Sequence, residues 1–326
     1  MKISAVIPTY NRRVEVSHAI ESVLSQTVPV YEIVVVDDGS TDGTAEFISD
    51  RYGPRVRVLR QKNAGVAASR NLGIREAQGD WVAFLDSDDF WFPSKIERQV
   101  EALASHESNP GICFTNNDFG GDPDLRLSVF DSTHFTGAQR TGLLEEPAQY
   151  MVAKLEPFYT SSFLIRRDLL EEVGGFDERM FIREDTDLFF RLSFRTRFCY
   201  VEEVLVRVDR TPNRAVGLCD LLNAMRDDRV FASCERLYRK WLMMSEVVGT
   251  QYEQPIRESL REVHYNSIEC KLRQGRVLPA LREVGRLRSI EEGFTSVFGN
   301  LLRRKIRKLQ SRNGGHEPNP EAATEE

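Results

Sequence analysis

Hydrophobic and polar positions in the first 115 residues alternate between two periods. Short runs rich in Val and Ile are typical of strands that are buried on both faces of a parallel sheet. Such runs occur at residues 3–7, 32–36, 55–59, 81–85 and 111–115. Between them, apolar residues recur at helical spacing. Strands that alternate with helices predict a doubly wound α/β sheet, in which ligands bind beyond the carboxyl ends of the strands.

Four helices are expected between these strands. They cover residues 14–24, a segment capped by Ser40 or Thr41 that ends at Tyr52, residues 64–77, and a segment that begins at Pro93.

The pattern changes after residue 115. Residues 116–147 are rich in Gly, Asp, Ser and Thr and have no sustained period, so we expect a long loop or an excursion from the sheet there. Strand patterns return at residues 161–165 and 198–208, on either side of a helical pattern at 184–194. The sheet is therefore expected to gain further strands from this part of the chain.

The C-terminal third is predicted to be helical. The pattern continues to Gln310, and Gly275 and Pro279 divide it into a helical hairpin. Residues 294–312 combine an apolar stripe with six basic residues and no acidic one. Two interpretations stay open: this segment packs on the rest of the protein or on a second subunit of a homo-oligomer, or it makes a peripheral contact with an anionic membrane. Residues 313–326 have no apolar face and are expected to be disordered.

Composition excludes several classes of protein. The chain has 326 residues, of which 41% are hydrophobic and 29% charged, as in globular proteins. It lacks the roughly 20 consecutive apolar residues of a membrane span and a secretory signal, so we expect a cytoplasmic protein. Its five cysteines are far apart, which fits a reducing compartment. The net charge of −6 argues against a general nucleic-acid-binding protein.

Acidic residues follow two of the predicted strands. Asp37 and Asp38 end the second, and Asp86, Asp88 and Asp89 follow the fourth. Each cluster alone is equally well explained as a set of turn or capping acids. Two clusters at one edge of a sheet raise the energy unless a cation offsets them, and carboxylate oxygens suit Mg²⁺ or Mn²⁺ bound together with substrate phosphates. The inferred ligand is therefore a diphosphate. The chain has no G-x-G-x-x-G and no P-loop motif, so neither a dinucleotide-binding protein nor a P-loop ATPase is expected.

Six segments in this order resemble the motifs of glycosyltransferase family 2. They are VIPTYN at 6–11, VDDGSTD at 36–42, NAGVAASRN at 63–71, DSDD at 86–89, GGFDE at 174–178 and EDTDLFFRL at 184–192. The resemblance covers roughly residues 1–210. It implies a GT-A-type fold, a mixed doubly wound sheet flanked by helices, here with a C-terminal helical extension. It also implies a nucleotide-diphosphate-sugar donor, a divalent cation, Mn²⁺ or Mg²⁺, and inversion at the anomeric carbon.

The resemblance also assigns roles to single residues. Pro8, Thr9, Tyr10, Asp37 and Asp38 would bind the nucleotide, with Asp38 accepting from a base such as uracil. Asp86 would touch the ribose or the metal, and Asp88 would bind the metal directly.

Arg70 has two interpretations. The resemblance places it near the base or the diphosphate of the donor. An Arg on a helix rich in Ala and Gly is also often a solvent-facing partner in a salt bridge.

Asp185 is expected to be the general base, with Glu184 as the neighbouring candidate. A sugar hydroxyl is a poor nucleophile, so a carboxylate must take its proton as it attacks. The alternative is that these acids only favour a helix N-terminus, and that Asp187 is a solvated surface acid. Trp91 and Phe92 would either cover the donor or belong to the core.

One position departs from the family pattern. Many relatives carry a metal-binding His after the last strand, whereas this chain has Arg207, Asp209, Arg210 and Arg214 in the corresponding segment. A third protein ligand is therefore in doubt, and Arg210 or Arg214 would meet the diphosphate directly, or Asp209 would bind the metal.

These features together predict an inverting glycosyltransferase. A UDP-sugar is the favoured donor, and the acceptor is a hydroxyl of a glycan or of a lipid-linked glycan. We expect residues 1–115 to form the nucleotide-sugar-binding half, 116–214 the acceptor-binding half and 215–312 a helical region. The alternatives are a transferase that acts on polyprenyl phosphate, which needs no base, and a non-catalytic nucleotide-sugar-binding or scaffold protein.

Overall fold

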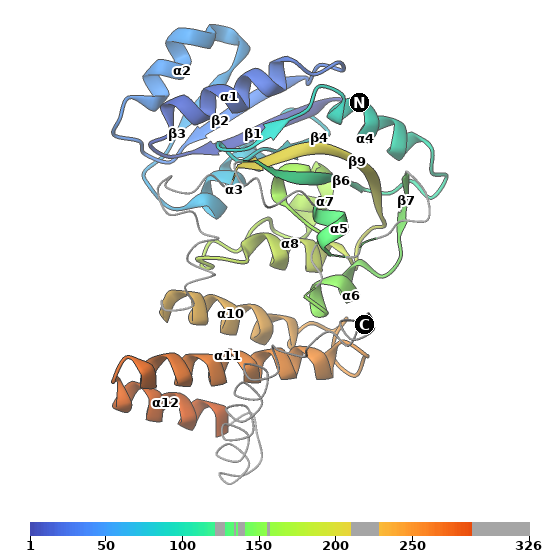
Figure 1. Ribbon diagram of the computed structural model, residues 1–326. Helices are drawn as coiled ribbons and strands as arrows, with labels where there is room; N and C mark the ends of the chain where they lie inside the picture. The colour runs from blue at the N-terminus through green and yellow to red at the C-terminus, as the bar shows by residue number, and fades with distance from the viewer. Residues whose placement is uncertain (121–127, 134, 136–140, 155–156, 210–227, 289–326) are drawn as a thin grey trace, which may run out of the picture.

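The structure, a computed structural model, describes residues 1–120, 128–133, 135, 141–154, 157–209 and 228–288. Its centre is one mixed sheet in the order β3-β2-β1-β4-β8-β6-β9-β5, with β7 paired to β9 (Figure 1). The strands are β1 (Ile3–Thr9), β2 (Glu32–Asp37), β3 (Arg57–Arg60), β4 (Trp81–Phe84), β5 (Phe90–Trp91), β6 (Ile112–Gly120), β7 (Thr141–Leu144), β8 (Leu164–Arg166) and β9 (Phe198–Asp209).

The strands run in both directions. β1 to β4 are parallel, so their carboxyl ends meet at one edge of the sheet. β8 is antiparallel to β4 and β6, and β6 is parallel to β9. Because β8 runs against β4, the turn before β8 lies beside the carboxyl end of β4. The predicted doubly wound mixed sheet is confirmed.

Helices cover both faces of the sheet. They are α1 (Arg13–Leu24), α2 (Thr44–Tyr52), α3 (Val66–Glu76), α4 (Lys95–Ala104), α5 (Val129–Ser132), α6 (Pro147–Val152), α7 (Arg167–Glu172), α8 (Glu184–Leu192), α10 (Asp228–Trp241), α11 (Glu253–Arg273) and α12 (Val277–Arg288). Apolar residues of α1, α2 and α4 pack on one face. Residues of α3, α7, α8 and α10 pack on the other. All four helices expected between the first strands are present.

The expectation of a long loop at 116–147 is wrong in part. β6 continues to Gly120, Ser128 caps the short helix α5 through its side chain, and β7 follows at Thr141. The pairing of β6 with β9 shifts register on both sides of Asn116, which interrupts the regular alternation of the strand. The Asn116 side chain fills its hydrogen bonds locally, accepting from the Phe130 N–H and donating to the Glu202 carbonyl.

The C-terminal helices form a separate layer. Figure 1 shows α8 between the sheet and α10, with α11 and α12 stacked beyond α10. The predicted hairpin is present as α11 and α12. The C-terminal half of α11 shares a small apolar core with α12. No helix of the described residues is long and apolar enough to cross a membrane. The basic segment 294–312 and the tail 313–326 lie outside the described residues, so the expectations for them stay predictions.

Candidate active site

The carboxyl ends of β1, β2 and β4 bring the first predicted residues together. Thr9 at the end of β1 is paired in register with Asp37 at the end of β2. The Thr9 hydroxyl is buried and has no hydrogen-bond partner among the residues that the structure describes. Tyr10, the next residue, exposes 46% of its surface. A buried polar group without a partner at a sheet edge is where a ligand would supply the missing hydrogen bond.

Asp38 holds two loops of this edge together. Its carboxylate accepts hydrogen bonds from the Gln61 side chain at 2.7 Å and from the N–H groups of Ala64 and Gly65 at 2.8 Å each. The two loops approach each other so closely that a Cβ on Gly39 would lie 2.9 Å from the backbone nitrogen of Asn63. Asp38 is therefore a loop-stabilising acid, and three of its roughly four acceptor positions are engaged.

Asp37 is completely buried and acts within its own turn. One oxygen accepts from the Ser40 N–H at 3.2 Å, and the other faces the Arg60 guanidinium at 3.4 Å. The turn-acid interpretation of this cluster therefore describes the observed contacts well.

The acids after β4 are crowded and only partly neutralised. Asp86 accepts from Arg70 at 2.6 Å, and Asp88 pairs with Arg12. Burial raises the pKa of Asp88, an effect that Asp86 increases and Arg12 opposes. Burial raises the pKa of Asp89 as well, to which the charges of Asp86 and Asp88 add. Carboxylates held this close gain stability from any further cation.

Arg70 joins the two acidic clusters. Its side chain is 4% exposed, and it donates to Asp86 at 2.6 Å and to Glu184 at 2.7 Å. Its guanidinium also lies 5.2 Å from the centre of the Phe176 ring. The neighbouring carboxylates raise its pKa although burial opposes this. The interpretation as a salt-bridge partner is correct, but the guanidinium does not face solvent.

The N-terminus of α8 carries the second acidic cluster. Burial and the charge of Asp185 raise the pKa of Glu184 to about 7, although the charge of Arg70 and its hydrogen bond oppose this shift. Asp185 is half-buried and accepts from the Thr160 hydroxyl at 3.3 Å and from the Thr186 N–H at 2.7 Å. Through Arg70 this cluster is two hydrogen bonds away from Asp86.

The interpretation of Asp187 as a solvated surface acid is wrong. Its side chain is completely buried and accepts from Arg191 at 2.9 Å, from Lys240 at 2.7 Å and from the Trp241 indole at 3.3 Å. Lys240 and Trp241 come from α10, far along the chain, so the sequence around Asp187 does not reveal these partners. Asp187 therefore attaches the helix that carries Asp185 to the C-terminal layer.

Several contacts at this edge were not predicted from the sequence. Arg12, Thr160 and Ser161 each bind one of the predicted acids, and no motif or period singles them out. Trp91 belongs to the core, because it is completely buried and its indole donates to the Ser161 carbonyl at 2.8 Å. The end of β9 also reaches this edge, since the Asp209 N–H donates to Asp89 at 3.3 Å. Arg210 and Arg214 lie outside the described residues.

Two groups of acids could hold a metal ion. Asp86 Oδ2 and Asp88 Oδ1 are not used in the contacts with Arg70 and Arg12, so the edge retains carboxylate oxygens for a hard divalent cation. In the C-terminal layer, Glu235, His264 and Glu283 also bring three possible ligand atoms together. There, Arg239 donates to Glu235 and Lys271 donates to Glu283. Cations therefore partly neutralise the acids of both groups.

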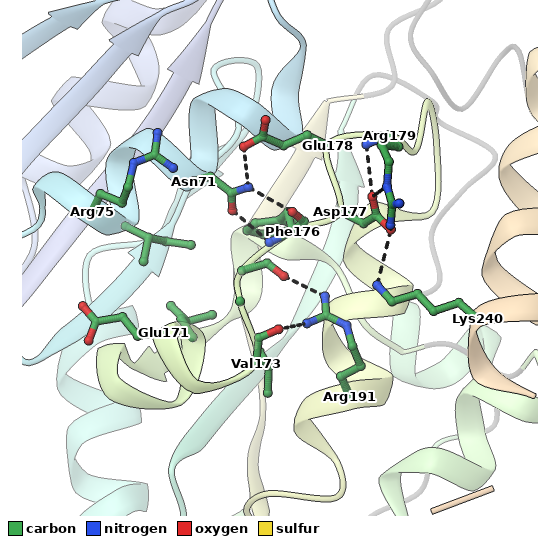
Figure 2. A pocket seen from close by; sticks show the side chains of 14 residues that line it. Asn71, Arg75, Glu171, Val173, Phe176, Asp177, Glu178, Arg179, Arg191 and Lys240 are labelled. Carbon is green, nitrogen blue, oxygen red and sulfur yellow. Dashed lines mark hydrogen bonds and ion pairs between the residues drawn. The ribbon is translucent and has the colours of Figure 1, made fainter. Parts of the chain in front are cut away.

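A pocket of about 630 Å³ is lined by none of the residues predicted to bind donor or metal (Figure 2). It is lined by the Gly174–Glu178 motif, α3 and α10. Figure 2 shows that the Asn71 side chain donates to the Phe176 carbonyl and accepts from the Phe176 N–H. Arg191 donates to the carbonyls of Val173 and Gly175. Gly175 has a φ of +66°, and a Cβ there would lie 2.4 Å from the Asn71 side chain. This motif thus has a structural role.

The chain is similar to several known proteins. Residues 4–174 match the family described as Glycosyl transferase family 2. A protein of Rickettsia felis, named an uncharacterized glycosyltransferase, is 50% identical over 103 residues, which are 31% of this chain and 17% of that protein. The hyaluronan synthase of Pasteurella multocida is 28% identical over 66% of this chain and 22% of its own length.

The fold resembles a solved structure as well. The crystal structure of Staphylococcus aureus TarS 1–349 in complex with UDP-GlcNAc has a TM-score of 0.63 and 18% identity, covering 90% of this chain and 82% of that one. At this identity the likeness shows the fold, and it confirms the expected GT-A architecture. The chain spans only about a fifth of the two curated relatives.

Proposed function

The chain belongs to glycosyl transferase family 2, and we propose that it is an inverting transferase that moves a sugar from a nucleotide-diphosphate sugar to a hydroxyl acceptor. The single observation that carries this proposal is the bridge through Arg70. It holds Asp86, beside the crowded acids after β4, and Glu184, beside Asp185, on one guanidinium. One acidic cluster next to the leaving diphosphate and another next to the attacking hydroxyl is the arrangement that this reaction needs.

The donor is proposed to lie at the carboxyl edge of β1, β2 and β4. The unpartnered Thr9 hydroxyl and the exposed Tyr10 are suited to the nucleoside, and Asp38 has one acceptor position left for a base N–H. A UDP-sugar is favoured, because the solved TarS structure that shares this fold holds UDP-GlcNAc. In this arrangement residues 1–115 bind the donor, and residues 116–214 face the acceptor.

Asp88, together with Asp86, is proposed to hold a divalent metal ion, Mn²⁺ or Mg²⁺. When bound, such an ion stabilises the negative charge that gathers on the departing diphosphate. Arg12 pairs with one oxygen of Asp88 and Arg70 with one oxygen of Asp86, so each carboxylate keeps a second oxygen outside these contacts. Asp89 stabilises the same loop, since its oxygens accept hydrogen bonds from the Ser161 hydroxyl and from the Asp209 N–H.

Asp185 is the proposed general base. Its carboxylate is half-buried and is held by Thr160 and by the Thr186 N–H, so it is oriented to take the proton of an acceptor hydroxyl. Glu184, with a pKa of about 7 and a direct contact to Arg70, is the less suitable base because its carboxylate already accepts from a guanidinium. A glycan or a lipid-linked glycan is the proposed acceptor.

The rival functions make different demands on these residues. A transferase acting on polyprenyl phosphate meets an acceptor oxygen that is already anionic, so it would not depend on Asp185. The function of a scaffold protein with no activity would require neither acidic cluster. The oriented Asp185 favours the hydroxyl acceptor over both.

Titration calorimetry with UDP tests the donor and metal sites. We expect UDP to bind more tightly when Mn²⁺ or Mg²⁺ is present, and we expect this gain to disappear in Asp88→Ala, because that variant removes a carboxylate from the crowded group. Asp50→Ala, which changes an exposed acid on α2, is the matched control and should bind as the unaltered chain does. Equal binding with and without metal in all three proteins would exclude the metal site.

A further inference from the structure

The turn that precedes β8 touches both acidic clusters. It is the 3₁₀ turn η2 (Thr160–Ser162), whose residues are all at most 4% exposed. The Thr160 hydroxyl donates to Asp185 Oδ2 at 3.3 Å. The next residue points to the other cluster: the Ser161 hydroxyl donates to Asp89 Oδ2 at 2.5 Å and accepts from the Asp86 N–H at 3.0 Å. Two adjacent hydroxyls therefore connect the proposed base to the proposed metal-binding loop.

The backbone of this turn is held by buried polar groups. The Trp91 indole donates to the Ser161 carbonyl at 2.8 Å, and the Gln99 amide donates to the Ser162 carbonyl at 2.9 Å. Lys95, completely buried, donates to Gln99 at 2.9 Å, and its ammonium lies 4.1 Å from the centre of the Trp91 ring. Displacing the turn would leave the buried Trp91 indole and Gln99 amide without these acceptors, which costs free energy, so these contacts hold its backbone in place.

The topology explains why the turn occupies this place. β8 pairs antiparallel with β4 through Leu164 and Ala83, so the start of β8 lies beside the end of β4. The chain from Asp86 to Asp89 leaves β4 at the same point. A residue placed just before β8 is thus in reach of this loop from one side and of α8 from the other.

From these contacts we propose that Thr160 and Ser161 are positioning residues of the transfer reaction. Thr160 orients the Asp185 carboxylate toward the acceptor, and Ser161 fixes the loop 86–89 that binds donor and metal. The turn sets the separation between the two clusters. This proposal rests on the proposed function, because it assigns the two hydroxyls to the base and to the metal side of that reaction.

The Thr160 arm is tested by kinetics. Thr160→Val keeps the shape and removes the hydroxyl. We therefore expect kcat for the hydrolysis of a UDP-sugar, in which water replaces the acceptor hydroxyl and UDP is released, to fall about tenfold at unchanged affinity for UDP. Thr160→Ser should restore most of the rate. In an Asp185→Asn background, Thr160→Val should cause no further loss, because residues that act through one another are not additive. Losses that multiply in the double variant would overturn the Thr160 assignment.

The Ser161 arm is tested by calorimetry with UDP and Mn²⁺, which needs no acceptor. Ser161→Ala should weaken the Mn²⁺-dependent binding of UDP about tenfold, and Ser161→Thr should recover part of it. Ser162→Ala is the matched control, since the Ser162 hydroxyl donates to the Tyr159 carbonyl and touches no acid. Equal affinity in Ser161→Ala and Ser162→Ala would refute the assignment. An unaltered chain that fails to bind UDP would instead contradict the proposed function itself.

Discussion

Glu184 gives a quantitative test of the electrostatics of this site. Burial and Asp185 raise its pKa from 4.5 to about 7, even though its carboxylate touches Arg70. Glu184→Gln preserves the shape and the acceptor oxygen for Arg70, but it cannot titrate. The variant therefore isolates the free energy of ionising this one side chain.

The sign follows from proton binding in the two states. Below pH 4.5 the Glu184 carboxyl is protonated in both the folded and the unfolded chain. Between pH 4.5 and about 7 the unfolded chain loses this proton while the folded chain keeps it, so the folded state loses stability as the pH rises. At about 1.36 kcal/mol per pH unit, the loss over this window reaches about 3 kcal/mol and then stops.

Urea unfolding of both proteins between pH 5 and pH 8 measures this effect. The free energy of unfolding of Glu184→Gln, minus that of the unaltered chain, should rise with pH and level off above pH 7. Asp88 and Asp89 titrate in both proteins, so to first order their contributions cancel in the difference. Glu253→Gln is the control: hydrogen bonds from Gly249 and Arg257 lower the pKa of Glu253, so its difference should stay constant above pH 5. A constant difference for Glu184→Gln would mean that Arg70 keeps Glu184 ionised, and would refute the reasoning.

Two further predictions concern α8. Asp185→Asn should lower the rate of sugar transfer on the order of 10²–10⁴-fold and leave the calorimetric affinity for UDP unchanged, because it removes a base and not a donor contact; a nearly normal rate would favour a phosphate acceptor. Asp187→Asn should lower the free energy of unfolding in urea by about 3 kcal/mol, since it removes the buried negative charge that pairs with Lys240 and Arg191. A loss as small as that of the exposed Asp50→Asn would contradict this role.

The sequence predicted the parts of this molecule that depend on local pattern. Buried strands carry continuous apolar runs, and acids that end parallel strands must meet at one edge, so the strands and the position of Asp37 and Asp86 follow from the chain itself. The loop prediction for 116–147 failed where a register shift at Asn116 hides the strand period.

Contacts between distant segments were beyond the reach of such patterns. Arg70 and Glu184 are 114 residues apart, and nothing in either segment specifies that one guanidinium binds both Asp86 and Glu184. Asp187 lies in an acidic first turn of α8, which from the sequence is typical of an exposed helix N-terminus. Its contact with Lys240 comes from the packing of α10. Thr160 and Ser161 belong to an ordinary polar turn, whose role depends on β8 pairing with β4.

The packing of α10 on α8 limits how far the chain can be truncated from its C-terminus. Phe190 of α8 stacks on Trp241 of α10 with ring centres 3.8 Å apart, and Lys240 reaches Asp187 in the same contact. Ile256 and Leu260 of α11 belong to the main core as well, whereas Tyr265 and Ile268 belong to the small core shared with α12. A chain cut before α10 would expose the rear of the helix that carries Asp185. A cut within α11, after its last contact with the main core, is the earliest one expected to leave that helix undisturbed.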